Sequence, residues 1–170
     1  QTTRNRIFTI AAIHEVLFKQ QSLKDIPFHN FLDRLRDILF NSNGKNGHPD
    51  IEINCDQLKL NINQAVSLGL MLNEILSRLT NGNGTQPCKA IKLSLNIDDK
   101  NKVITKLDIQ QLDEEIKEKL IQPDQYLPAT LIEVLTQQLE ATLNHTKDIN
   151  RDIFKIQFKK EHKKGGSSSL

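Results

Sequence analysis

The sequence predicts an α+β fold, a two-layer α/β sandwich in which a mixed sheet carries helices on one face. A strongly apolar helical segment covers residues 63–79, and a probable hairpin of alternating apolar and polar residues follows at 90–97 and 103–109. Segments with helical periodicity stand on both sides of these, and a last strand is predicted at 153–158. Helices with one apolar stripe bury it against another layer, so we expect them to cover one side of the sheet.

Two helices are predicted before the first strand. Apolar residues recur at helical spacing over residues 4–19, where little lies nearby to bury the stripe, so this segment requires a partner helix. A second helix is expected from Asp25 to about Asn41, because Pro27 suits a first turn and apolar residues then continue at the helical period.

Short strands and loops surround the apolar helix. Residues 41–49 have loop composition, and period-two alternation at 51–55 and 58–60 predicts strand segments. Apolar residues occupy most of the circumference of the helix at 63–79, so we expect it to be the most buried element. A second loop, at 81–87, leads into the hairpin.

Two helices and a strand complete the predicted domain. A charged helix is expected at 112–121 and ends before Pro123. Helical spacing from Leu127 to Leu143 predicts a last helix, and the strand at 153–158 closes the domain. Residues 165–169 are rich in Gly and Ser and resemble a linker or a disordered tail.

Charge and hydropathy restrict the partners. The chain has 23 Lys and Arg against 21 Asp and Glu, and a net charge of +2 selects neither nucleic acid nor an anionic membrane. The basic run from Lys159 to Lys164 is typical of a solvated tail. No apolar run approaches the roughly 18 residues of a membrane span, and the start lacks the pattern of a signal peptide. We therefore expect a cytoplasmic location, no nucleic-acid partner and no membrane contact by this chain.

The cysteines and histidines show no catalytic or metal-binding pattern. Cys55 and Cys88 are isolated, which predicts reduced, half-buried thiols, and a chain of this length does not need a disulfide. Neither a Ser/His/Asp nor a Cys/His set has a local signature. The histidines are scattered without metal-ligand spacing, and we expect the two in predicted loops, His48 and His145, to be surface residues. The five are His14, His29, His48, His145 and His162.

Three segments carry a family pattern: RIFTIAAIHEVLF at 6–18, FLDRL at 31–35 and VSLGLMLNEIL at 66–76. They resemble the bacterial sensor histidine kinases of the subfamily whose second dimerisation helix has the pattern R-x-x-x-[IM]-A-x-[IL]-H-E-x-L-[YF]. The first and third segments are fairly specific together, and each alone would be weak. Residues 135–143 and 153–159 are similar to the family's last helix and last strand, so the resemblance covers nearly the whole chain.

The resemblance implies a division into three parts. Residues 1–20 would be the second helix of a dimerisation and phosphotransfer hairpin, 25–160 a Bergerat-type (GHKL) ATPase-like domain, and 161–170 a disordered tail. The first hairpin helix, which carries the phosphoacceptor histidine in that family, lies outside this chain. For His14, on the second helix, we favour helix packing over a phosphoacceptor role. The packing face and part of a homodimer interface would be formed by Ile7, Ile10, Leu17 and Phe18.

Phosphoryl transfer from ATP requires a Mg²⁺ ligand, a group that binds adenine, and glycines beside the phosphates. In the resembled family's pattern N-E-L-x-x-N-A-x-K-H, the second Asn ligates Mg²⁺ and the Glu acts as base or positions water. Asn73 and Glu74 are present here, but Arg78 stands in place of the Mg²⁺-binding Asn, and a cation there repels the metal. We therefore regard Asn73 and Glu74 as vestigial catalytic residues and expect no metal site.

Both glycine boxes of the resembled family are also lost. The adenine box falls on residues 108–113, where Asp108 stands in place of the adenine-binding Asp and neither glycine is present. The lid box falls on 125–132, where no glycine remains and Pro128 is unsuited to a helix start that donates amides to phosphate. Asp108 would then be a vestigial nucleotide-binding residue. We expect no cofactor, with ATP and Mg²⁺ bound only if the kinase is active.

These losses leave three functional hypotheses. The first is a two-component signal transduction protein, sensor histidine kinase-like with a degenerate nucleotide site, in effect a pseudokinase. It would act in histidine phosphotransfer or dock the receiver domain of a response regulator, as a homodimer formed through the dimerisation helices. The second is an active ATP-binding catalytic domain of a sensor histidine kinase. The third is a non-enzymatic adaptor, which the sequence does not separate from the first because the phosphoacceptor lies outside this chain.

Overall fold

The computed structural model describes residue 11 and residues 26–41, 49–80, 88–121 and 131–161. The elements follow one another as β1 (Ile26–Pro27), α2 (Phe28–Asn41), β2 (Asp50–Cys55), β3 (Lys59–Leu60), α3 (Ile62–Thr80), β4 (Ala90–Ile97), β5 (Lys102–Gln110), α4 (Glu114–Ile121), α5 (Leu131–Gln138), β6 (Thr142–Asp148) and β7 (Arg151–Lys159). Consecutive strands (β2 and β3, β4 and β5, β6 and β7) and consecutive helices (α4 and α5) occur along the chain, as expected for the predicted α+β class and not for a strictly alternating α/β fold.

One mixed sheet forms the framework of the domain. Its strand order is β2-β4-β5-β7-β6, with β2 parallel to β4 and every other pair antiparallel. In the register of the three central strands, Leu107 of β5 lies between Leu93 of β4 and Phe154 of β7. A second, two-stranded sheet is formed by β1 and β3. The mixed five-stranded sheet confirms the predicted fold class.

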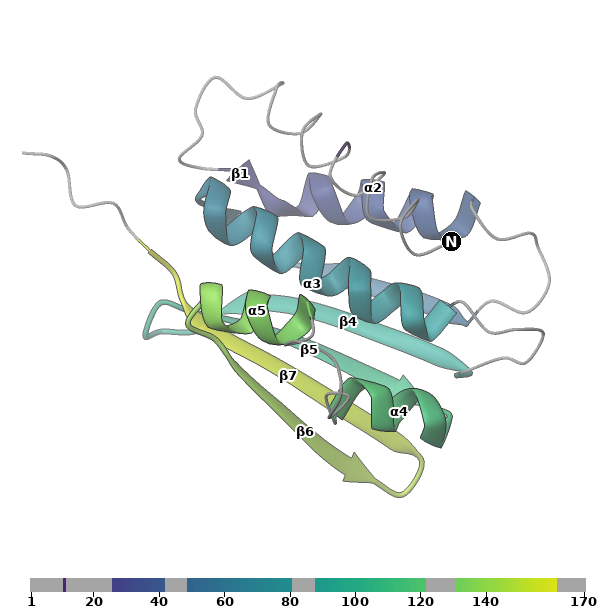
Figure 1. The fold of residues 1–170 in the computed structure, drawn as a ribbon. Helices are drawn as coiled ribbons and strands as arrows, with labels where there is room; N and C mark the ends of the chain where they lie inside the picture. The colour runs from purple at the N-terminus through teal and green to yellow at the C-terminus, as the bar shows by residue number, and fades with distance from the viewer. Residues whose placement is uncertain (1–10, 12–25, 42–48, 81–87, 122–130, 162–170) are drawn as a thin grey trace, which may run out of the picture.

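The helices lie on one side of the sheet. Figure 1 shows α3, α4 and α5 in front of the strands, with α2 alongside α3. Among the described residues no element covers the opposite side, which we call the open face. The result is the two-layer sandwich that the sequence predicts.

Helix α3 forms the centre of the core. Most of its side chains are buried, Leu68, Met71 and Leu72 completely so. They pack against the inward residues of the sheet, in which every second position of β4, β5 and β7 is buried. Burial of each large apolar side chain stabilises the fold by about 1.5–3 kcal/mol. The expectation that this helix is the most buried element is therefore confirmed.

Two polar residues fix the start of α3. The Asn61 side-chain oxygen accepts a hydrogen bond from the backbone N–H of Gln64 at 2.9 Å, which is the geometry of a helix N-cap. The Gln64 side chain in turn donates to the carbonyl oxygen of Lys159 at 2.8 Å. The beginning of the central helix is thereby tied to the end of β7.

Two element boundaries differ from the sequence prediction near the N-terminus and the C-terminus. Ile26 and Pro27 pair with β3 instead of starting the helix, so α2 begins at Phe28, whose N–H donates to Leu58 O at 2.8 Å. The predicted helix from Leu127 to Leu143 is wrong beyond Gln138, where α5 ends. The residues 142–148 form strand β6 instead.

Local backbone geometry explains the end of α5. Glu140 has a φ of 50°, in the left-handed region, and the N–H of Ala141 donates to Thr136 O at 2.9 Å. This pattern closes a helix C-terminus and turns the chain into β6. Leu139 and Leu143 have the i, i+4 spacing of one helix face, but Leu143 lies opposite Ile156 in the sheet. Pairing with β7 therefore overrides the local helical spacing.

The predicted N-terminal helix at 4–19 and the predicted tail at 161–170 lie outside the described residues, except for Ala11 and Glu161.

Candidate functional site

The two residues predicted to be a vestigial catalytic pair lie in the second half of α3. Asn73 and Glu74 are 2% and 3% exposed, although both are polar. The Ser77 hydroxyl donates to the side-chain oxygen of Asn73 at 3.4 Å, one turn along the helix. Thr80 donates to the carbonyl oxygen of Leu76 at 2.9 Å. The polar side chains of this stripe thus find partners within α3 itself.

Glu74 forms an ion pair with Arg78. The Arg78 Nη2 and Nε atoms lie 3.0 and 3.3 Å from the same carboxylate oxygen of Glu74. A buried carboxylate is costly without a cationic partner, and the guanidinium supplies one. Arg78, which the sequence places where the resembled family has its Mg²⁺-binding Asn, therefore contacts the carboxylate of Glu74 directly. These residues do not fit a Mg²⁺ ion, which needs oxygen ligands at this position.

Asp108 lies on the open face, separated from Glu74 by the sheet. Its neighbours on β5, Leu107 and Ile109, are buried towards the helices, so the Asp108 side chain points the other way. It lies 3.6 Å from both Lys106 Nζ and Arg151 Nη1. The structure therefore does not bring Asp108 together with Asn73 and Glu74.

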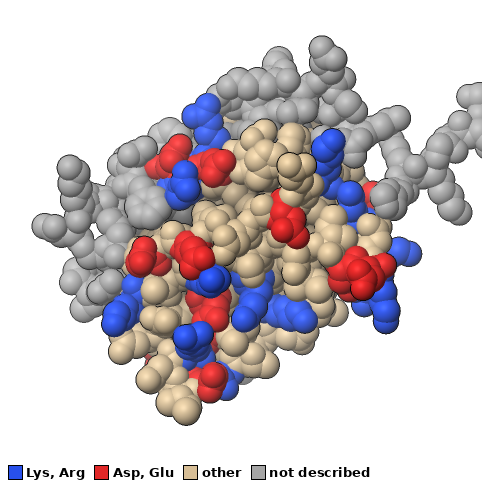
Figure 2. Space-filling model, turned by 180° about the vertical axis from the view of Figure 1, so that it is seen from behind, with Lys and Arg blue, Asp and Glu red and all other residues tan. Residues whose placement is uncertain are grey.

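A shallow hollow surrounds Asp108 on the open face. Its volume is about 240 Å³. The lining side chains are mostly charged or polar, and Lys92 in it forms an ion pair with Glu52 at 3.0 Å. Figure 2 shows the molecule from behind, where Lys and Arg side chains are interspersed with Asp and Glu. The hollow is lined by Asp50, Glu52, Ala90, Ile91, Lys92, Asp108, Gln110 and Arg151.

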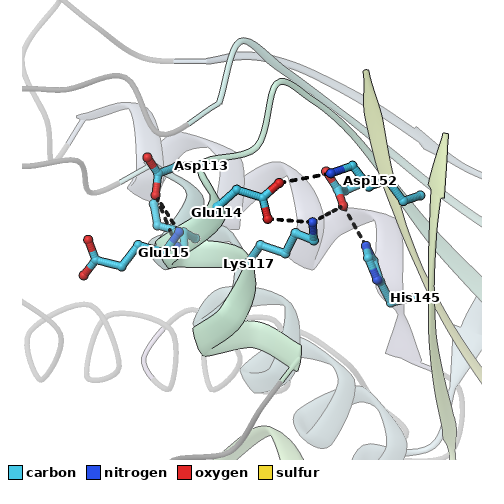
Figure 3. A network of polar contacts seen from close by, with 8 residues as sticks. Asp113, Glu114, Glu115, Lys117, His145 and Asp152 are labelled. Atoms are coloured by element: carbon cyan, nitrogen blue, oxygen red, sulfur yellow. Dashed lines mark hydrogen bonds and ion pairs between the residues drawn. The ribbon is translucent and has the colours of Figure 1, made fainter. Parts of the chain in front are cut away.

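A second polar network joins α4 to the edge hairpin of β6 and β7 (Figure 3). Its centre is Asp152, which is 4% exposed. One Asp152 carboxylate oxygen lies 2.7 Å from His145 Nε2 and 3.7 Å from Lys117 Nζ. Lys117 also pairs with Glu114 at 2.8 Å, and Lys147 pairs with Glu114 at 3.0 Å. The network therefore links two strands and one helix through a single buried carboxylate.

Charge pairing shifts two pKa values in this network. Hydrogen bonds from Lys117 and Lys147 lower the pKa of Glu114, and the hydrogen bond to Glu114 raises the pKa of Lys117. Both groups therefore stay charged at neutral pH. The start of α4 is capped separately, because Asp113 accepts hydrogen bonds from the N–H groups of Glu115 and Ile116 at 3.0 and 3.3 Å.

The sequence prediction for His145 is wrong. It is not a surface loop residue but lies half-buried in β6, with its ring 4.7 Å from that of Phe154. The Asp152 carboxylate orients the imidazole, as in catalytic His/Asp pairs, yet no Ser or Cys side chain is joined to this network by any contact among the described residues. Residues 142–148 contain a single apolar side chain, Leu143, so no local periodicity signals His145, and Asp152 lies on the next strand, β7.

The described part of the chain contains no candidate metal site and no thiol that is ionised at neutral pH. No group of three or more His, Cys, Asp or Glu side chains in it could hold a metal ion. Cys55 and Cys88 are free thiols, as predicted, although Cys88 is fully buried. Burial raises their pKa values to about 11 and about 12, so both stay protonated at neutral pH.

Several predicted positions lie outside the described residues. They include most of the lid box with Pro128, and His14. The predicted homodimer face also lies there, namely Ile7, Ile10, Leu17 and Phe18. None of the helices in the described ranges is both long and apolar enough to cross a membrane.

Comparisons with known proteins agree with this fold. A family model described as histidine kinase matches residues 1–43. A comparison with curated protein sequences found no match. The blue-light activated histidine kinase of Erythrobacter litoralis EL346 superposes with a TM-score of 0.73 and 17% identity, over 96% of this chain and 55% of that chain. The present chain thus spans about half the length of that kinase.

Two more distant structures share the same architecture. The Acinetobacter baumannii histidine kinase AdeS superposes with a TM-score of 0.55 and 12% identity, over 92% of this chain and 77% of that one. A structure described as a bacterial phosphotransferase gives a TM-score of 0.54 and 11% identity, over 87% of this chain and 71% of that one. At such low identities, the superpositions establish the fold alone. Together with the family model they support the resemblance to a sensor histidine kinase core with an ATPase-like domain.

Proposed function

We propose that the chain acts in two-component signalling as a histidine kinase-like module with a degenerate nucleotide site. It would take part in phosphotransfer, or dock the receiver domain of a response regulator, and would not use ATP for autophosphorylation. The class rests on the family model over residues 1–43 and on the fold shared with histidine kinases. The homodimer expected for this module would form through the N-terminal helices.

The contact between Glu74 and Arg78 carries the proposal. A Mg²⁺-dependent site needs an oxygen ligand and a free carboxylate here, and the structure supplies a guanidinium 3.0 Å from that carboxylate. The position of Asp108 on the open face adds support, because an adenine-binding carboxylate has to face the helices that carry the rest of the site. Both observations support a degenerate nucleotide site.

One of the similar structures is described as a phosphotransferase and not as a histidine kinase. The structure described as a bacterial phosphotransferase covers 87% of this chain at a TM-score of 0.54. A histidine kinase-like architecture that serves in phosphotransfer is thus a physical precedent for the proposal. The phosphoacceptor histidine would be supplied by the first hairpin helix, outside this chain.

Isothermal titration calorimetry with ATP and Mg²⁺ tests the proposal. We expect no heat of binding, and no rise in melting temperature at saturating nucleotide, where a bound ligand at about 100 times its Kd would add about 2.7 kcal/mol to the stability. An active histidine kinase catalytic domain serves as positive control, and EDTA replaces Mg²⁺ in a parallel titration. Micromolar binding that disappears with EDTA would overturn the degenerate site and support the active kinase instead.

A second measurement separates phosphotransfer from a plain adaptor. The chain is fused to a first hairpin helix that carries a phosphoacceptor histidine, and a panel of phosphorylated receiver domains is added. Transfer of the phosphoryl group to that histidine supports the proposal. Receiver binding without transfer would favour docking. If the receiver domains neither bind nor transfer the phosphoryl group, the adaptor is favoured.

A further inference from the structure

The open face of the sheet has an uneven distribution of charge. The strands alternate between buried residues that face the helices and residues that face the other way, and the latter form the open face, seen from behind in Figure 2. One end of the face contains both signs, with acidic residues at Asp50, Glu52, Asp108 and Asp148. Lys92 and Arg151 lie among these acids and pair with them at 3.0 and 3.6 Å.

The other end of the open face carries two like-charge pairs. Lys106 lies directly opposite Lys155, and Lys102 directly opposite Lys159, in the antiparallel register of β5 and β7. These four residues are called the lysine cluster below. Like charges directly across a sheet destabilise it, and here two such pairs occur on the same two strands. Folding alone gives no reason for this arrangement.

Most of the lysine cluster forms no ion pair within the described part of the chain. Lys106 lies 3.6 Å from Asp108, and the other three lysines make no ion pair with any residue that the structure describes. Their neighbours in register are neutral: Lys106 faces Ser94 on β4, and Lys155 faces Asn144 on β6. The open-face side chains of β5 and β7 thus include four lysines at this end, next to the turn residue Asp98, whose carboxylate accepts a hydrogen bond from the Lys102 N–H at 2.8 Å.

The backbone that carries the cluster is held in place. The Asn101 side chain donates to Lys160 O at 3.1 Å, and the Lys160 N–H donates to Asn101 O at 3.0 Å. Gln64 of α3 donates to Lys159 O at 2.8 Å. The strands below the lysine side chains are thus fixed, so that a ligand has to order these side chains but not the backbone that carries them.

The surroundings of the cluster discriminate between classes of anion. Single-stranded nucleic acids bind by stacking bases on aromatic side chains, and no described open-face position is aromatic, since Phe154 and Phe158 are buried on the helix side. A long polyanion running along the strands would also meet Asp108 and Glu52 at the other end. A protein surface with a local patch of carboxylates needs no aromatic side chains for stacking, and it does not extend to Asp108 and Glu52.

We propose that the lysine cluster docks an acidic surface patch of a protein partner. Opposite charge on the partner would remove the repulsion within both lysine pairs and would accelerate encounter. The surface lies on the side of the sheet opposite Glu74 and Arg78, so it does not depend on whether the nucleotide site is degenerate.

Fluorescence anisotropy with a labelled poly-L-glutamate peptide tests the proposal on the 170-residue chain. The variant K106Q/K155Q removes one lysine pair, and K59Q/K89Q removes two exposed lysines outside the face as a charge-matched control. We expect K106Q/K155Q to weaken binding about tenfold, the control to leave it nearly unchanged, and added salt to weaken it further.

Two outcomes would overturn the proposal. Equal losses in both variants would show that only net charge matters, and tighter binding of an oligothymidylate than of the peptide would assign the face to nucleic acid. Circular dichroism of each variant confirms folding, which we expect to be retained because K106Q/K155Q removes a like-charge pair.

Discussion

Glu74 and Arg78 lie one turn apart on α3, with 3.0 Å between a carboxylate oxygen and Nη2. The Glu74 side chain is 3% exposed, whereas that of Arg78 is 30% exposed. The two partners therefore depend on the contact unequally. Loss of the guanidinium leaves a charge inside the protein, and loss of the carboxylate leaves a charge that water reaches.

This asymmetry predicts the effect of substitutions in α3. R78M is expected to lower the free energy of unfolding by about 1–3 kcal/mol, because it leaves the Glu74 carboxylate buried without this partner. E74Q should have a smaller effect, and E74Q/R78M should recover part of the loss. Urea denaturation of the three variants measures these differences. If R78M is no less stable than E74Q, the ion pair does not compensate for the burial of Glu74.

The burial of the Asp152 carboxylate predicts that substitutions at Asp152 and at Glu114 differ in their effect on stability. D152N is expected to destabilise the fold by about 1–3 kcal/mol, because the amide replaces a charged acceptor that lies 2.7 Å from His145. E114Q, in the same network but on the exposed side of α4, should have a clearly smaller effect. Thermal unfolding of both variants tests the prediction. A larger loss in E114Q would place the centre of the network on α4 and not on β7.

The pairing of Lys106 with Lys155 predicts a stabilising substitution. K155E replaces a like-charge cross-strand pair by an opposite-charge pair and is expected to raise the free energy of unfolding by about 0.2–1 kcal/mol. Urea denaturation at low salt measures the gain, which should shrink as salt is added. K89E, outside the open face, is the matched control. A loss of stability in K155E alone would mean that Lys155 makes a favourable contact in the folded protein.

Cys88 predicts a loss of stability at alkaline pH. Burial raises its pKa from the ordinary 9.0 to about 12, so the folded protein keeps the thiol proton that the unfolded chain releases. The corresponding stability is fully present below pH 9 and is lost as the pH rises from about 9 to about 12. C88A should flatten this part of the pH profile. Denaturation midpoints from pH 8 upward measure it, and an unchanged slope in C88A would contradict the assignment.

The fold class was predictable because its strongest signals are local. The apolar circumference of α3 and the alternation of β4 and β5 each need only a short window of sequence. Strand β6 was not predictable in this way, because Leu139 and Leu143 have helical spacing and only pairing with β7 decides between helix and strand. His145 and Asp152 were missed for the same reason, since they meet across that strand pair.

For the candidate site, too, some features follow from the sequence and others only from the tertiary structure. The sequence alone showed that Arg78 replaces the Mg²⁺-binding Asn of the resembled family, because position within a motif is a property of the chain. That Arg78 contacts Glu74 depends on helix geometry and burial, and that Asp108 faces away from Glu74 depends on which side of β5 the helices cover.

The sequence by itself therefore determined the class of fold, the apolar central helix and the residue types at the motif positions. The tertiary structure decided which residues meet. The lysine pairs of the open face and the network around Asp152 join positions on different strands, and their contacts follow from strand register. Register depends on which alternate residues of each strand face α3 and on the turns between strands, so it follows from how the strands combine and not from one strand alone.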